Sequence, residues 1–446
     1  MEIEENSVKI GADKENLSPE EGCESKLERK RDKKKKSKKS KKSKKSKKEK
    51  KVKDKSEKKR RLQNALKPIQ KRAIPPLIPP LFSPNCQRIV DKIRLKFPRS
   101  IKSKVYFNSS LCEDWAQNKE YDNAQHINGL LMSEDDFLTL YDRENSPAVI
   151  SNVMSEWKAS SWTIESLLKD YEEINFLVGG HGYFDERIPM KLKLFAEYMK
   201  NNEDDVPLML HDYGYNRRMS TKVLKDDYIE PSFFGKDYLG YMAEARRPPW
   251  RFFSIIPKRS GHKLYRNPYK ESIWEAVITG KRRYVLFEPE SPKDLIKGVS
   301  IPGCEGNNSE CDAIVYFDKV LPKIIAHEDV KAKCDRYEMI QAVVEPGEMI
   351  FIPSGWYYCY VALEDSISLS QSFCSEVNFD DVWRTLRYKD ERLAYLWFEF
   401  IERFEPIMIR KLRKVNEKDG VPEWTKEYEE KRNAKACAPL AYDDYN

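Results

Sequence analysis

Short apolar runs separated by turn residues dominate the middle of the chain, from about residue 173 to 375. The stretch AVVEPGEMIFIPSGWYYCYVALEDSISLSQSF, at 342–373, predicts three short strands, which are broken at Pro346-Gly347, Ser354-Gly355 and Glu364-Asp365. Short strands with regular turn punctuation are typical of a barrel or a sandwich. We therefore expect a mainly β domain over residues 173–378.

A second pair of apolar runs in this region predicts a β-hairpin. SIWEAVIT and RRYVLFEP are both rich in β-branched and aromatic residues, and only Gly280-Lys281 separates them. A short turn that contains glycine between two such runs is a hairpin signal.

Helical periodicity flanks the β region on both sides. Residues 86–172 predict a mainly helical N-terminal support with one strand at 146–153 and with helices that begin at Ser133 and Thr163. Residues 379–415 predict C-terminal helices. Their apolar stripe would serve either as core packing or as the face of a homodimer, and it comprises Val382, Trp383, Leu386, Leu393, Leu396 and Phe400.

The ends of the chain lack such periodicity. Residues 1–72 are lysine-rich and low in complexity, which predicts a disordered tail. Residues 73–85 contain AIPPLIPPLFSP, whose paired prolines predict an extended linker. The polar segment 416–446 is expected to be loose.

The formal net charge of +8 is distributed unevenly. Residues 26–61 contain 24 Lys or Arg and 5 Asp or Glu, whereas residues 1–25 carry −6, so residues 62–446 carry −5. Clustered lysines bind phosphates by releasing counterions. The segment 26–61 therefore predicts a nuclear-import signal and an arm that could bind RNA or DNA, with a solvated charge run as the alternative.

The cysteines and the apolar runs indicate in which cellular compartment the protein is expected. The nine cysteines form no CxxC pair, which is typical of reduced thiols in a cytosolic or nuclear protein. Cys304, Cys311 and Cys334 would supply only three zinc ligands. We expect neither a membrane span nor a signal peptide, because no apolar run is long enough for either.

Several sequence segments between about residues 110 and 390 resemble the Jumonji C (JmjC, cupin-like) family and follow the same order along the chain. They include FLTLYDRENSPAVI, WTIESLLKDY, NPYKESIWEAVITGKRRYVLFEP and PGEMIFIPSGWYY. The nearest subgroup is the one once described as a phosphatidylserine receptor and now regarded as nuclear lysyl hydroxylases. The resemblance implies a double-stranded β-helix with flanking helices, which holds Fe(II) through an HxD pair and a distant His and leaves positions for 2-oxoglutarate and oxygen.

The metal positions that the resemblance implies carry other residues here. Six residues, HKLYRN, separate RSG from the next proline, as in the family, so Tyr265 and Asn267 stand at the HxD positions. Tyr358 stands where the distant His is expected. A phenol must lose its proton to bind a metal, and an amide offers only a neutral oxygen, so we expect a degenerate site without metal.

His262 is the one histidine near these positions. Side chains alternate between the two faces of a strand, so His262 is expected to point away from Tyr265 unless a bulge intervenes. We interpret it as a surface or loop histidine. The remaining histidines are expected to be structural, namely His126, His181, His211 and His327.

The 2-oxoglutarate positions that the resemblance implies are only partly changed. Arg282 stands at the family's basic position and Ser370 at its hydroxyl position, so both are vestigial cosubstrate residues. Glu275 replaces a family Asn. Two outcomes follow: Arg282 pairs with Glu275 inside the protein, or the site still binds a small anion.

Three functions remain open from the sequence. The first is a catalytically inactive nuclear binding or scaffolding module for chromatin or RNA-processing partners, without cofactor. The second is an Fe(II)- and 2-oxoglutarate-dependent oxygenase, of the lysyl hydroxylase or histone demethylase type, with non-standard ligands. The third is a nucleic-acid binder that acts through the basic tail.

Overall fold

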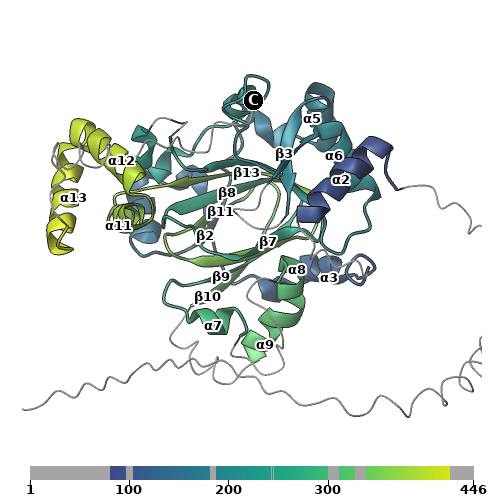
Figure 1. The fold of residues 1–446 in the computed structure, drawn as a ribbon. Coiled ribbons are helices and arrows are strands. Elements are labelled where there is room, and N and C mark those ends of the chain that lie inside the picture. Colours follow the sequence, from purple (N-terminus) through teal and green to yellow (C-terminus); the bar gives the residue numbers. More distant parts are fainter. Residues whose placement is uncertain are drawn as a thin grey trace, which may run out of the picture. The chain divides into compact units, whose positions relative to one another are not determined.

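Two β-sheets face each other at the centre of the structure, which is a computed structural model (Figure 1). The structure describes residues 81–96, 104–180, 187–242, 244, 246–299, 311–326 and 338–421, all within the unit Pro80–Asn446. The predictions for the tail 1–72, for most of the linker 73–85 and for most of the segment 416–446 lie outside these residues. So do the interpretations of four single residues, which are His181, Cys304, His327 and Cys334.

The larger sheet has nine strands among the described residues, in the order β1-β2-β11-β8-β13-β6-β5-β3-β4. They are β1 (Gln125–Asn128), β2 (Ala148–Ser151), β3 (Asn175–Gly179), β4 (Ile188–Lys191), β5 (Met209–Asp212), β6 (Arg251–Ile256), β8 (Ser272–Thr279), β11 (Met349–Ile352) and β13 (Ser366–Phe373). The smaller sheet has the order β10-β9-β12-β7. Its strands are β7 (Gly261–Tyr265), β9 (Arg282–Phe287), β10 (Met339–Val344) and β12 (Tyr357–Ala362). This architecture confirms the expected mainly β, cupin-like fold with flanking helices.

Alternating side chains fill the space between the two sheets. Because successive residues of a strand point to opposite faces, every second residue of the central strands turns inward. The inward residues form one apolar cluster that draws on both sheets. Examples are Val277 of β8, Ile350 of β11, Leu286 of β9 and Tyr360 of β12.

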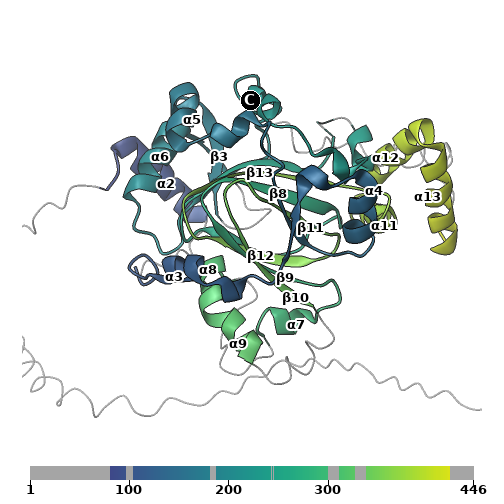
Figure 2. The same ribbon diagram turned by 180° about the vertical axis from the view of Figure 1, so that it is seen from behind.

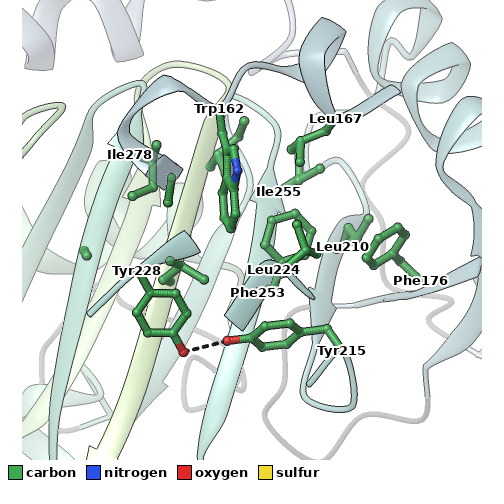
Figure 3. Packing of buried hydrophobic residues seen from close by; sticks show 14 of the residues in the cluster. Trp162, Leu167, Phe176, Leu210, Tyr215, Leu224, Tyr228, Phe253, Ile255 and Ile278 are labelled. Carbon is green, nitrogen blue, oxygen red and sulfur yellow. Dashed lines mark hydrogen bonds between the residues drawn. The ribbon is translucent and has the colours of Figure 1, made fainter. Parts of the chain in front are cut away.

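The outer face of the larger sheet carries the largest apolar cluster (Figure 3). Phe253 and Ile255 of β6 pack there against Trp162 and Leu167, and the Tyr215 and Tyr228 hydroxyls share a hydrogen bond of 2.8 Å. The helices beside this cluster are α2 (Pro84–Lys96), α5 (Ile164–Tyr171) and α6 (Leu192–Asn201). They shield one face of the sheet from water.

Short helices cover the outer face of the smaller sheet. They are α3 (Leu111–Gln117), α7 (Lys293–Ile296), α8 (Ala313–Val315) and α9 (Leu321–Ala326); in Figure 1, α7 and α9 lie below the sheet and α3 and α8 to its right. Trp115 of α3 and Phe317 of the π-helical segment Tyr316–Val320, between α8 and α9, pack against Val285 and Cys359 of the sheet. Both sheets are therefore covered on the side that faces away from the centre.

The C-terminal helices group at one end of the sheets (Figure 2). They are α11 (Phe379–Lys389), α12 (Glu391–Phe404) and α13 (Pro406–Lys418), and the short helix α4 (Glu134–Phe137) lies nearby. Four of the stripe residues are buried in one cluster, which are Val382, Trp383, Leu386 and Leu393. Among the described residues, no helix has the length and apolar character that a bilayer span requires.

The predicted hairpin is wrong. Strands β8 and β9 follow each other as expected, but β8 pairs with β11 and β13, whereas β9 pairs with β10 and β12. The turn at Gly280 carries the chain from one sheet to the other. Its positive φ of 72° bends the backbone sharply there.

Two further predictions need correction. The segment 342–373 lies across four strands, β10 to β13, instead of three. The segment before residue 173 contributes two strands instead of one, because β1 pairs in parallel with β2. The helix starts at Ser133 and Thr163 are confirmed, since each side chain accepts a hydrogen bond from the backbone N–H three residues later.

Candidate functional site

The structure brings Tyr265, Asn267 and Tyr358 together at one end of the barrel. Strand β7 ends at Tyr265 and β12 begins at Tyr357, and the two strands pair with Tyr265 opposite Tyr358. The two rings meet edge to face, with centroids 5.6 Å apart. The Tyr358 hydroxyl lies 3.4 Å from Asn267 Oδ1, and Asn267 Nδ2 donates to the Glu271 carbonyl at 3.0 Å.

The donors at these three positions do not fit Fe(II). A facial triad needs two neutral imidazoles and a carboxylate, whereas two phenols and an amide stand here. Asn267 and Tyr358 are buried, and the Tyr358 hydroxyl faces the Asn267 amide oxygen. Within the described part of the chain, no group of three His, Cys, Asp or Glu residues is placed to hold a metal ion.

The prediction that His262 points away and lies on the surface is wrong. A bulge interrupts the pairing of β7 with β12, because Tyr360 pairs with His262 while Tyr358 pairs with Tyr265. The extra residue turns the His262 ring to the face that carries Tyr265, with centroids 4.8 Å apart. His262 is only 4% exposed, and its Nδ1 donates to the Lys263 carbonyl at 2.8 Å.

An ion pair lies deeper in the barrel. Arg282 of β9 is fully buried, and its Nη1 donates to Oε1 of Glu275, which is 4% exposed. The two side chains come from different sheets and meet between them. The structure thus confirms the expected internal pairing of Arg282 with Glu275.

Further donors surround the Glu275 carboxylate. The Tyr284 hydroxyl donates to Oε2 at 2.9 Å and the Ser368 hydroxyl to Oε1 at 3.0 Å. Arg282 Nε donates to the Ser366 hydroxyl at 2.9 Å. Burial and then the Glu275 charge raise the pKa of Tyr284 well above its ordinary value, so the phenol stays a donor.

Ser370 lies in register with Glu275, but the hydroxyl that contacts the carboxylate belongs to Ser368. Sequence reasoning missed Ser366, Ser368 and Tyr284. The signal was present in SISLSQS, where serines recur at every second residue of a strand and so share one face.

His211 of β5 is a buried neighbour of this group. Its Nδ1 lies 2.7 Å from the Ser254 hydroxyl, and its ring stacks on Phe252 with centroids 4.4 Å apart. Burial, followed by the charge of Arg187, holds the pKa of His211 well below its ordinary value. A neutral, hydrogen-bonded imidazole fits the expected structural role.

Charged side chains ring the same end of the barrel as Asn267. The Arg247 and Arg251 guanidinium carbons lie 3.8 and 4.1 Å from the Trp250 ring centroid. Arg247 pairs with Asp237 and Arg251 with Glu230, each at 2.6 Å. Each arginine is thus paired with a carboxylate, and the two ion pairs form one network around the Trp250 ring.

Comparison with known proteins gives the same picture of the fold. A family model described as a cupin-like domain matches residues 257–379, which contain Tyr265, Asn267, Tyr358 and the Glu275–Arg282 pair. The bifunctional arginine demethylase and lysyl-hydroxylase psr-1 of Caenorhabditis elegans is 30% identical over 297 residues, which are 66% of this chain and 72% of that protein.

Two other relatives match shorter shares of their length. The arginine-specific demethylase JMJ22 of Arabidopsis thaliana is 28% identical over 291 residues, which are 64% of this chain and 53% of that protein. The 2-oxoglutarate and iron-dependent oxygenase JMJD4 of Danio rerio is 29% identical over 206 residues, 44% of this chain and 45% of that protein. Together with the paired sheets and the matched cupin-like domain, the similarity to psr-1 shows that this chain belongs to the JmjC family of cupin-like proteins.

Proposed function

We propose that this chain is a non-catalytic member of the JmjC family, which serves as a binding or scaffolding module. The observation that carries the proposal is the contact among Tyr265, Asn267 and Tyr358. Their two rings and the amide pack against one another at the positions where the resemblance implies iron ligands. Chemistry in a JmjC barrel depends on the open coordination positions of Fe(II). Phenol and amide donors do not supply that ion with ligands at neutral pH.

A second candidate function is an active oxygenase with non-standard ligands. It is favoured by one observation, which is that His262 lies beside Tyr265 and Tyr358 and is not turned away from them. The relatives named above as demethylases, hydroxylases or oxygenases share the fold. Against this candidate, His262 belongs to no group of three His, Cys, Asp or Glu residues that could hold a metal ion in the described part of the chain.

Turnover of 2-oxoglutarate separates the two candidates. The full-length protein is incubated with Fe(II), ascorbate and 2-oxoglutarate, with and without a lysine-rich peptide, and succinate is measured by NMR. We expect no succinate above the protein-free control. The psr-1 relative serves as the positive control, and enzyme-dependent succinate from this chain would establish the oxygenase instead.

The location of the module is part of the proposal. The lysine-rich segment 26–61 supports a nuclear address and a contact with RNA, DNA or acidic nuclear proteins, because its charge of +19 attracts polyanions. Deleting this segment from a fluorescent fusion should abolish nuclear accumulation.

The contact with RNA is tested by measuring the RNA affinity of the same deletion variant and of the full-length protein at two salt concentrations. Equal affinities of the two proteins would exclude a contact that depends on residues 26–61.

A further inference from the structure

The interior of the barrel holds a guanidinium that needs a counter-anion. Arg282 has no exposed surface, and a buried charge is stable only when it is paired and hydrogen-bonded. Burial by itself disfavours the charged form, but the Glu275 carboxylate then outweighs it, so the pKa of Arg282 stays above its ordinary value. Arg282 therefore stays protonated, and its buried positive charge always requires an anion beside it.

The surroundings of Arg282 have the composition of a carboxylate-binding site. Tyr284 and Ser368 donate to the two oxygens of the Glu275 carboxylate, one to each oxygen. Arg282 contacts only Oε1, through Nη1, and its Nη2 has no hydrogen-bond partner among the described residues. A guanidinium can hold a planar carboxylate through two parallel bonds, so the tethered side chain leaves part of the donor set unused.

We propose that the Glu275 carboxylate is the resident ligand of a carboxylate-binding subsite formed by Arg282, Tyr284 and Ser368, and that it closes this subsite to free carboxylates. The protein thus carries its own anion, attached to strand β8, where an exchangeable one would bind. This inference rests on the proposed function, because only a barrel that binds no metal and turns over no cosubstrate can keep a permanently attached anion at this place. The binding event itself is measurable without any metal.

The size of the tether decides which free ligand should replace it. The substitution Glu275→Ala keeps Cβ and removes a CH₂ group with the carboxylate, which together amount to acetate. The space left between the sheets would retain Arg282, Tyr284 and Ser368 as donors, and the Tyr360 ring would remain 5.2 Å from the guanidinium carbon. Acetate is therefore the probe that matches this space.

The test is rescue of Glu275→Ala by acetate. The full-length variant is refolded from urea in EDTA, with sodium acetate or with sodium chloride at equal ionic strength, and its thermal unfolding is followed by circular dichroism. Acetate should raise the Tm in a saturable manner, by about 4 °C at a hundredfold excess over Kd. Wild type should show no acetate-specific shift and no heat of binding with acetate or 2-oxoglutarate.

The double variant Glu275→Ala/Arg282→Met is the matched control, because it lacks both charges and should fold without responding to acetate. The inference is overturned if Glu275→Ala gains nothing from acetate, if it fails to refold in acetate while the double variant folds, or if wild type binds a free carboxylate with saturation. Iron uptake and succinate formation are measured separately. A failure of the proposed function would appear there and would leave the acetate result intact.

Discussion

At the scale of single residues, burial decides what each polar group can do. Glu275 and Arg282 lie between the sheets, where their attraction compensates the loss of hydration. The sequence could predict this pair, because the resemblance to the JmjC family places both residues at positions of the 2-oxoglutarate site. It could not predict the place of His262, since the bulge arises from the pairing of β7 with a strand almost a hundred residues later.

Breaking the buried pair should be costly, whereas removing both charges should not. We expect Arg282→Met to lower the free energy of unfolding by about 3–5 kcal/mol, because Glu275 would be left buried without its cation. The double variant Glu275→Leu/Arg282→Met should lose much less. Urea unfolding of wild type, the single variants Arg282→Met and Glu275→Leu and the double variant measures this coupling, and simple addition of the two single costs would contradict it.

The strand register suggests how a metal site could be restored. The substitutions Tyr265→His, Asn267→Asp and Tyr358→His place two imidazoles and a carboxylate where the resemblance implies the iron ligands. We expect this triple variant to bind one divalent metal ion but not 2-oxoglutarate, because Glu275 still occupies Arg282. Adding Glu275→Asn should allow 2-oxoglutarate to bind, as measured by calorimetry under anaerobic conditions. Binding of 2-oxoglutarate to the triple variant alone would argue against the role given to Glu275.

At the scale of elements, the chain crosses between sheets where its local pattern resembles a hairpin. Two apolar runs around a glycine look the same whether the strands pair with each other or with distant partners. The choice depends on long-range pairing, here of β8 with β13 and of β9 with β12. The helix caps at Ser133 and Thr163 could be predicted because they depend only on residues within one turn.

The crossing makes Gly280 more sensitive to substitution than Gly347, which also has a positive φ. It has a φ of +72°, and a Cβ there would lie 2.3 Å from the Asp365 carbonyl oxygen. Gly347 has a φ of +87° with nothing within 4 Å. We expect Gly347→Ala to cost about 1–2 kcal/mol through backbone strain alone, and Gly280→Ala about 3 kcal/mol or more. Equal costs in urea unfolding would mean that the contact with Asp365 relaxes freely.

Asp142 ends the π-helical segment Leu138–Asp142, which follows α4, and its burial gives stability a pH dependence. Burial raises the pKa of Asp142 to about 6 from an ordinary value of 3.8. The native state then holds more protons between these values, so stability falls as pH rises from about 4 to 6 and stays lowered above. Asp142→Asn should therefore stabilise the protein by up to about 3 kcal/mol at pH 7.5 and much less at pH 4. Asp135→Asn, at an exposed residue of α4, is the control, and a pH-independent difference for Asp142→Asn would refute the assignment.

At the scale of the whole molecule, the two covered sheets leave an interior whose contents decide the function. The sequence blocks that resemble the JmjC family predicted the fold, because they extend over strands of both sheets and over the flanking helices. They could not predict that the Tyr284 and Ser368 hydroxyls donate to Glu275, since these contacts depend on how distant strands pair and face each other. The relatives psr-1 and JMJD4 are similar to this chain in sequence. The groups that donate hydrogen bonds inside the barrel were identified from the structure of this chain.

The most direct test of the account is the iron content of the full-length protein. The protein is incubated anaerobically with excess Fe(II) and 2-oxoglutarate, freed of unbound metal by gel filtration, and analysed by inductively coupled plasma mass spectrometry. The account predicts far less than one iron per chain, the same as for a variant with Tyr265→Phe and Tyr358→Phe. One iron per chain in the native protein, lost in that variant, would contradict it.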